Sequence, residues 1–269
     1  MAKPRSNSSG LGFRLFQAPP RSMDYVTLST RPLHILTFLI PFVALYEIGS
    51  FLYLHHPSRG VVDTIGAHGI LAGFFNTFGV VSFHIPPILL IVVLLTWHLV
   101  EKDPLGIRLS VMLGMLAESL LWTLPLLVFG LLFQRHTAAM DTPLAQNALN
   151  ALSWQAKLTL SAGAGVYEEL LFRFFLITTA QFIISDLIGG TKGVSLTIGA
   201  IVSATCFALY HNIAHPGGGV DLRLFLYFAV AGLYFAALFI FRGLGIAVAA
   251  HFIYDAVVLV AIPATWGKS

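Results

Sequence analysis

The segment 166–176 places three charged side chains inside an apolar run that otherwise has the character of a membrane-spanning helix. They are Glu168, Glu169 and Arg173. On insertion scales each charge would cost roughly 2.5–3.5 kcal/mol at the centre of a bilayer if it faced lipid. The chain must therefore fold so that these groups turn away from lipid and are compensated within the protein.

Helical spacing divides these charges into a pair and a single carboxylate. Glu169 and Arg173 are four residues apart, so they share a helix face and are expected to form a structural ion pair. Glu168 points about 100° away from its neighbour. A carboxylate that faces a protein-lined, partly dry cavity suits a general base that works near neutral pH. We therefore expect a functional role for Glu168.

The composition excludes an ordinary soluble domain, because 57% of the 269 residues are hydrophobic, only 10% are charged and the mean hydropathy is +0.84. The net charge of +3 does not indicate nucleic-acid binding, because the basic residues lie in short segments between apolar runs. The single cysteine, Cys206, permits no intrachain disulfide and is not assigned as a nucleophile.

Apolar windows near the length of a bilayer span predict an all-α, polytopic transmembrane helix bundle. Seven windows occur, at about residues 33–54, 82–100, 109–133, 163–187, 194–211, 222–241 and 243–262. The segment 61–79 is also apolar, but Asp63, His68 and several glycines interrupt it. We favour an interfacial helix there over a re-entrant segment or an eighth span.

The basic residues favour a cytoplasmic N-terminus and an external C-terminus. In the seven-span arrangement, nine Lys and Arg residues fall on the inner side and five on the outer side. An eighth span at 61–79 would reverse the orientation of everything that follows. The expected location is a bacterial or archaeal cell membrane, in which the chain is an integral, multi-pass protein.

Two further spans bring polar side chains to membrane depth. The fifth span ends with Phe207 and His211, and the seventh contains His251 and Asp255, which share a helix face. With alternating span directions, Glu168 and these three ionisable residues can reach one depth in the outer half of the bundle. This arrangement predicts a water-accessible polar pocket, with Phe207 as a packing wall for the His211 ring.

Such a pocket could support metal-free peptide hydrolysis. Glu168 and His211 would activate a water that attacks an amide carbonyl, while His251 and Asp255 would stabilise the oxyanion and the leaving group. Asp255 can donate a hydrogen bond only if it is protonated; otherwise it would orient His251. This chemistry needs no cofactor.

Two other chemistries remain open on the residues alone. Glu168, His211 and His251 could bind Zn²⁺ as a scattered site, although the chain has no His-Glu-x-x-His motif. His215 could join them only if the fifth helix continued that far, which Pro216 disfavours. The same groups could also form the proton relay of a transporter, but we find no repeated halves.

The ordered triplet of motifs on C-terminal helices resembles the CAAX protease and bacteriocin-processing family. This family is also called the ABI family and includes the Ras-converting CAAX endopeptidases. The motifs are Glu168-Glu169-x-x-x-Arg173, Phe207-x-x-x-His211 and His251-x-x-x-Asp255. The similarity covers roughly residues 158–262.

The resemblance implies an intramembrane glutamate-type endopeptidase. By analogy Glu168 and His211 would activate water, and His251 with Asp255 would form the oxyanion site. Glu169 and Arg173 would support them. Many relatives carry Asn where this chain has Asp255, although Asp also occurs there. The substrate would be a membrane-associated protein or peptide reached from the lipid bilayer, with no nucleic acid involved.

The competing interpretations are a non-catalytic membrane binding or bacteriocin-immunity protein and a zinc-dependent membrane protease. We divide the chain into a polar N-terminal tail (1–32), transmembrane spans with an amphipathic connector (33–157), a protease core (158–262) and a C-terminal tail (263–269). A plain connector packed on the bundle is the alternative for residues 134–161. Glu47 and Glu118, in other spans, are expected to bind polar groups across helices.

Overall fold

The computed structural model describes residues 23–56, 61–62, 65–77, 79, 84–103, 105–137, 151–214 and 218–261. The helices of its first half are α2 (Tyr25–Ser29), α3 (Pro32–Tyr53), α4 (Gly66–Asn76), α5 (Ile85–Glu101) and α6 (Leu109–Thr137). Those of its second half are α8 (Trp154–Gly163), η1 (Ala164–Phe175), α9 (Leu176–Gln181), η2 (Phe182–Leu187), α10 (Lys192–Tyr210), α11 (Leu222–Arg242), α12 (Leu244–Ala256) and η3 (Val257–Ala261). Two short strands, β1 (His55–His56) and β2 (Val61–Val62), pair antiparallel after α3.

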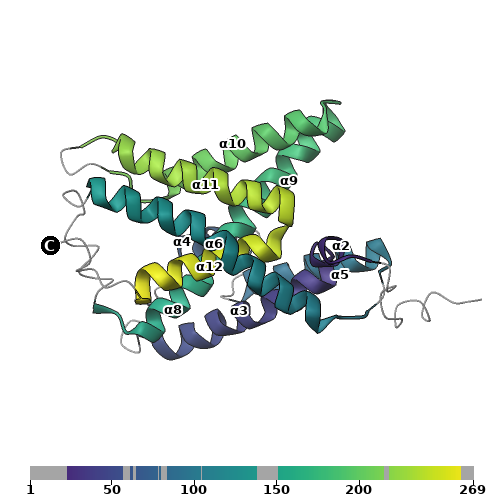
Figure 1. The fold of residues 1–269 in the computed structure, drawn as a ribbon, viewed down its shortest axis with the longest axis horizontal. Coiled ribbons are helices and arrows are strands. Elements are labelled where there is room, and N and C mark those ends of the chain that lie inside the picture. The colour runs from purple at the N-terminus through teal and green to yellow at the C-terminus, as the bar shows by residue number, and fades with distance from the viewer. Residues whose placement is uncertain are drawn as a thin grey trace, which may run out of the picture.

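The prediction of a helical bundle with about seven spans is confirmed. Within the described residues, six helices are long and apolar enough to cross a membrane, and α5 is a shorter apolar helix. In Figure 1, α10 and α11 lie side by side, α6 and α12 cross the middle, and α3 packs with α8 on the opposite side. The protein is therefore a multi-pass membrane protein.

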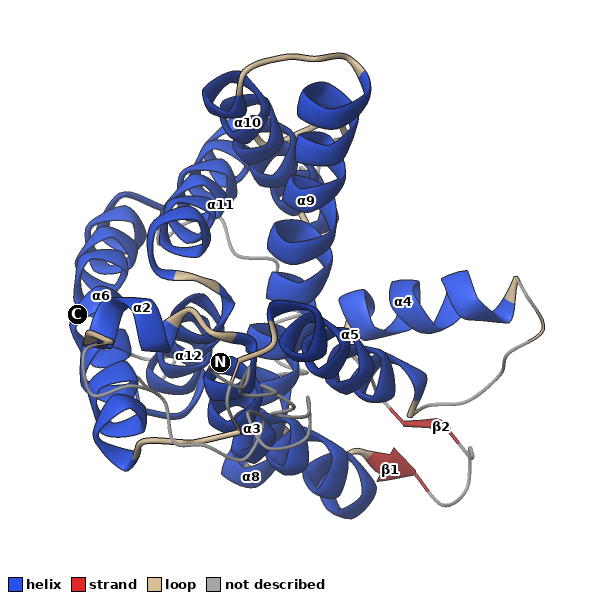
Figure 2. Cartoon of the chain, turned by 90° about the vertical axis from the view of Figure 1, so that its right-hand side faces the viewer, coloured by secondary structure: helices blue, strands red, loops and turns tan. Residues whose placement is uncertain are grey.

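The apolar segment 61–79 does not supply an eighth transmembrane helix among the described residues. Its helix, α4, has 11 residues, which at about 1.5 Å per residue cannot cross a hydrocarbon core of about 30 Å. Figure 2 shows α4 extending from the bundle above β1 and β2. Its first turn packs against η1, where His68 meets the Tyr167 ring at 4.9 Å.

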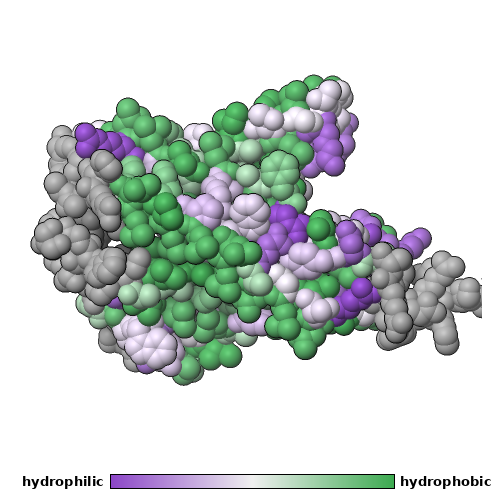
Figure 3. Space-filling view, in the orientation of Figure 1, coloured by the Kyte–Doolittle hydropathy of each residue, from purple (hydrophilic) through white to green (hydrophobic). Residues whose placement is uncertain are grey.

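The distribution of side chains suits a lipid environment. Large apolar residues are exposed on the outside, among them Phe51 (74%) and Phe241 (76%), whereas Glu168 and Arg173 are buried. Figure 3 shows apolar side chains covering the face over α6, with hydrophilic ones gathered where α2 and α5 lie. Such an apolar surface is unfavourable in water, but the lipid tails of a bilayer can cover it.

Local sequence explains where several helices begin and end. The Ser153, Thr191 and Asp221 side chains accept backbone hydrogen bonds from the first turns of α8, α10 and α11. Gly243 has φ 85°, which only glycine adopts readily, and it separates α11 from α12 without a longer loop.

The fourth span begins earlier than its apolar window predicted. The window starts near residue 163, but α8, η1, α9 and η2 form one span from Trp154 to Leu187. The Ser153 cap starts the helix within a stretch whose polar residues, such as Gln155 and Lys157, lowered the hydropathy. Part of the predicted amphipathic segment 134–161 lies outside the described residues, as do residues 1–22 of the tail, so the proposed domain division stays a prediction.

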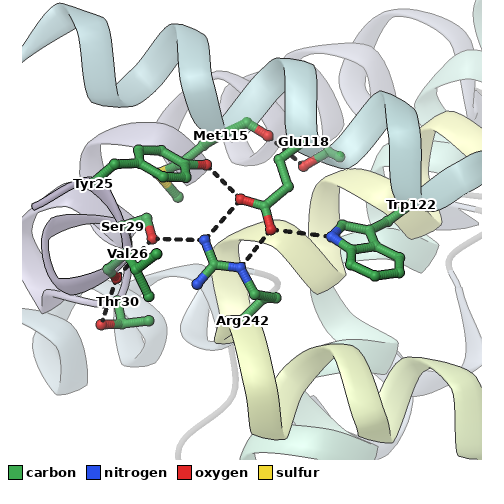
Figure 4. A network of polar contacts seen from close by, with 9 residues as sticks. Tyr25, Val26, Ser29, Thr30, Met115, Glu118, Trp122 and Arg242 are labelled. Carbon is green, nitrogen blue, oxygen red and sulfur yellow. Dashed lines mark hydrogen bonds and ion pairs between the residues drawn. The ribbon is translucent and has the colours of Figure 1, made fainter.

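A polar network fixes α2 to the bundle and includes one of the acids predicted to bind across helices (Figure 4). Glu118 on α6 accepts hydrogen bonds from Tyr25 at 2.6 Å and Trp122 at 3.0 Å, and it pairs with Arg242 at the end of α11. Arg242 also donates to Ser29 on α2 at 3.3 Å. Glu118 therefore has a structural role here, which matches the prediction.

Glu47 on α3 likewise bonds to groups outside its own helix. One carboxylate oxygen accepts from the Tyr167 hydroxyl at 3.1 Å, and the other lies 2.7 Å from His84 Nδ1. Tyr167 belongs to η1, immediately before the glutamate pair, so Glu47 fixes the side of η1 that faces α3.

Candidate active site

Glu168, Glu169 and Arg173 all lie on η1, and all three are buried. This element is a π-helix of 12 residues rather than the regular α-helix expected from the apolar run. π-helical turns are rare and are found frequently at functional sites. Its hydrogen-bond register cannot be inferred from an apolar pattern, because α- and π-helices both keep residues four apart on one face.

Glu169 is the centre of a buried ionic cluster. Its Oε1 lies 3.1 Å from Arg173 Nη1, so the predicted i,i+4 pair is present, and both side chains have no exposed surface. The same oxygen lies 2.7 Å from His251 Nδ1 on α12. Because an ionised carboxylate only accepts hydrogen bonds, Nδ1 must carry a proton and donate it to Glu169. Glu169 thus holds Arg173 and orients the His251 ring.

The second nitrogen of His251 faces two other carboxylates. Nε2 lies 3.9 Å from Glu168 Oε2 and 3.6 Å from Asp255 Oδ2. These separations are longer than direct hydrogen bonds, and one oxygen atom of a water or a substrate can reach both Nε2 and a carboxylate at hydrogen-bond distance. Glu168, His251 and Asp255 therefore converge on one small volume.

Aromatic rings enclose the cationic part of the cluster. The Arg173 guanidinium lies 4.1 Å from the centre of the Phe207 ring and 5.3 Å from that of Phe235. Phe235 also stacks on the His251 ring at 4.5 Å. These cation–π and stacking contacts replace water around a buried charge without adding a polar group that needs a partner.

His211 follows the last residue of α10. Its Nδ1 lies 2.7 Å from the Phe207 carbonyl oxygen, and its ring stacks on Phe228 at 4.0 Å. A carbonyl only accepts, so Nδ1 donates, and Nε2 of the neutral ring is an acceptor. The Phe207 ring contacts His211 at 4.4 Å, in agreement with a packing role.

The structure thus brings Glu168, Glu169, Arg173, His251 and Asp255 into direct contact or near-contact. Among the described contacts, none joins His211 to Glu168 directly; the Phe207 ring contacts both His211 and His251. Within the described part of the chain, no three His, Cys, Asp or Glu side chains have the arrangement of a metal site. His215, considered as a further ligand, lies outside the described residues.

Gly165 allows the two helices of the cluster to approach closely. A Cβ atom at this position would lie 2.9 Å from the Val248 carbonyl oxygen and 3.0 Å from the Phe252 backbone nitrogen, both on α12. Any larger residue would therefore move η1 away from α12, and with it Glu168 away from His251. The sequence did not indicate this requirement, because the glycine occurs in an otherwise ordinary apolar run.

Gly165→Ala is expected to lower turnover by about 10-fold to 100-fold, since a misplacement of about 1 Å can cost 10²-fold. Overpacking at this contact is expected to cost about 1–3 kcal/mol of stability. Gly193→Ala on α10 is the matched control, because its Cβ would meet nothing within 4 Å. Turnover rates and melting temperatures of both variants test this; equal turnover in the two would show that the close approach is unimportant.

Comparison with protein-family models gives a match over residues 150–257, to the family described as type II CAAX prenyl endopeptidase Rce1-like. The matched range contains every candidate site residue named above, and it leaves out α2 to α6. Neither the curated proteins nor the solved structures contain a significant match to the chain.

Proposed function

We propose that this chain, whose residues 150–257 match the model of the type II CAAX prenyl endopeptidase Rce1-like family, is a member of that family and a glutamate-type intramembrane endopeptidase. A member of this family would be a protease that acts in a membrane on a membrane-associated protein substrate. The observation that carries the finer proposal is the buried cluster in which His251 Nε2 faces Glu168 and Asp255 while Nδ1 is held by Glu169.

Glu168 is proposed as the general base. A water between Glu168 and the substrate would lose a proton to the carboxylate as its oxygen attacks the peptide carbonyl carbon. The tetrahedral intermediate then collapses, the C–N bond breaks, and the proton passes from Glu168 to the leaving amine. The near-contact of Glu168 with His251 supports this role, because it places the base beside a group that can bind the oxyanion.

His251 is proposed as the oxyanion donor. Nδ1–H is engaged by Glu169, so Nε2 can donate to the developing oxyanion only when the ring carries both protons. An imidazolium ring is compatible with its surroundings, since the carboxylates of Glu168, Glu169 and Asp255 all lie near it. Asp255 would orient and charge His251 from its position 3.6 Å from Nε2.

His211 is proposed to hold the attacking water together with Glu168. The Nδ1–H bond to Phe207 leaves Nε2 as the acceptor, which suits a hydrogen bond from water. Apo sites often have longer catalytic distances than their substrate complexes. His211 and Glu168 would approach the same water when a substrate binds.

The membrane arrangement is part of the proposal. The N-terminus would be cytoplasmic, residues 158–262 would form the protease core, and the membrane would be that of a bacterial or archaeal cell. The candidate residues would then lie in the outer half of the bundle, where a membrane-associated peptide can reach them.

Hydrolysis by the purified protein in liposomes tests the function. The substrates are a peptide that ends in a prenylated CAAX sequence and the same peptide without the lipid, in water enriched in ¹⁸O. We expect the prenylated peptide to be cleaved at one bond, with one ¹⁸O atom in the new carboxyl group. Activity should be unchanged after treatment with a zinc chelator. Loss of activity on chelation would favour a zinc protease. Intact peptides would favour a non-catalytic membrane binding or immunity protein.

A further inference from the structure

Tyr210, the last residue of α10, contacts both α4 and η1, the element that carries Glu168. Its hydroxyl oxygen accepts a hydrogen bond of 2.9 Å from the backbone N–H of Ala67 in the first turn of α4. The Tyr210 ring packs on Phe172, which lies four residues after Glu168 on η1, so the phenol lies beside the face of η1 that carries Glu168. A phenol has one proton to donate, and since the bond from Ala67 uses an oxygen lone pair, that proton remains available to the Glu168 carboxylate.

The Tyr210 ring is held in place from several sides. It packs against Phe172 on η1 at 5.2 Å and edge-on against His211 at 5.2 Å. Gly66 lies directly against it: a Cβ atom there would come within 2.8 Å of the hydroxyl oxygen. The start of α4 therefore fits closely around this hydroxyl.

We infer that Tyr210 is a positioning residue, which α4 holds in place so that its hydroxyl orients the Glu168 carboxylate. This inference rests on the proposed function, because it assigns a partner to the general base. It also gives α4 a role: the helix that leaves the bundle in Figure 2 fixes the geometry of the site through one backbone N–H. Tyr210 acts through Glu168 and does not itself contact the substrate.

Two variants disturb the contact in different ways, and each has a matched control. Tyr210→Phe removes the hydroxyl and keeps the ring; Tyr234→Phe, its control, removes a hydroxyl that binds the Trp122 carbonyl oxygen on α6. Gly66→Ala keeps the hydroxyl but displaces it, since the nearest atoms lie at the end of a side chain that can turn. Gly73→Ala on the same helix is its control, because nothing lies within 4 Å of the added methyl group.

We expect both Tyr210→Phe and Gly66→Ala to lower kcat by about fivefold to tenfold, the value of one hydrogen bond, with KM within about twofold. The double variant should be no slower than Tyr210→Phe, because both changes disrupt the same interaction of the Tyr210 hydroxyl. Both controls should keep wild-type kcat. Melting temperatures of all variants, measured in the same lipid, separate a positioning role from a loss of folded protein.

Wild-type kcat in Tyr210→Phe, with the wild type cleaving the peptide, would overturn the inference and leave the proposed function intact. An equal fall in Tyr234→Phe would show a general effect of removing a hydroxyl and would also overturn it. If the wild-type protein cleaves neither the prenylated nor the unmodified peptide, the proposed function fails, and the positioning role fails with it.

Discussion

Glu168→Gln is expected to lower turnover by about 10²–10⁴-fold, the usual contribution of a general base. Glutamine has nearly the same size and keeps a carbonyl oxygen, but it cannot take a proton from water. The contacts of Glu168 are near-contacts rather than close ion pairs, with 3.9 Å to His251 Nε2, so the fold does not depend on its charge. The variant should therefore accumulate and melt like the wild type.

Glu47→Gln is the matched control for this experiment. Glu47 is also a carboxylate within a span, and it accepts hydrogen bonds from another helix, but it lies outside the Glu169 cluster. Turnover of the prenylated peptide by both purified variants in the same lipid gives the comparison. Glu168→Gln within about twofold of the wild type would remove Glu168 from the proposed mechanism.

Glu169→Leu is expected to have the largest effect on stability. It leaves Arg173 buried without a counter-charge and removes the acceptor of His251 Nδ1. Breaking a buried ion pair in this way costs about 3–5 kcal/mol. We therefore expect little folded protein and a much lower melting temperature, whereas Glu101→Leu, which breaks an exposed pair with Arg31, should cost about 0–1 kcal/mol.

The double variant Glu169→Leu/Arg173→Met separates folding from chemistry. It removes both members of the pair and replaces them by apolar side chains of similar volume, which is often close to neutral for stability. We expect the double variant to recover much of the melting temperature lost by Glu169→Leu but no activity, because His251 still lacks its acceptor. A Glu169→Leu protein as stable as the wild type would contradict the structural role of the pair.

Much of the fold followed from local patterns in the sequence. Apolar windows of bilayer length predicted about seven spans. The charges at 168, 169 and 173 predicted that this helix turns one side into the protein, away from lipid. The four-residue spacing of Glu169 and Arg173 predicted their ion pair, because that contact is made within one helix. Glu118 was expected to bind across helices, and it does so with Arg242 and Tyr25.

The remaining features depend on how one helix lies against another, which local patterns do not contain. His251 lies closer to Glu169 than to Glu168. Which of the two glutamates it meets depends on the register of α12 against η1. The π-helical form of η1 leaves no recognisable pattern of residue types in the sequence. The contact of Tyr210 with α4 joins residues that are far apart in the sequence. The early start of α8 was missed because polar residues such as Gln155 and Lys157 lower the hydropathy of its first turns.

The most direct test of the central claim compares peptide termini in membranes of cells that express the wild-type protein or Glu168→Gln, at equal amounts of folded protein. This measurement needs no prior choice of substrate. The proposed mechanism predicts new termini on membrane-associated proteins that occur only with the wild type. New termini that are equally abundant with Glu168→Gln, under conditions in which the wild-type protein is active, would contradict the assignment of Glu168 as the base.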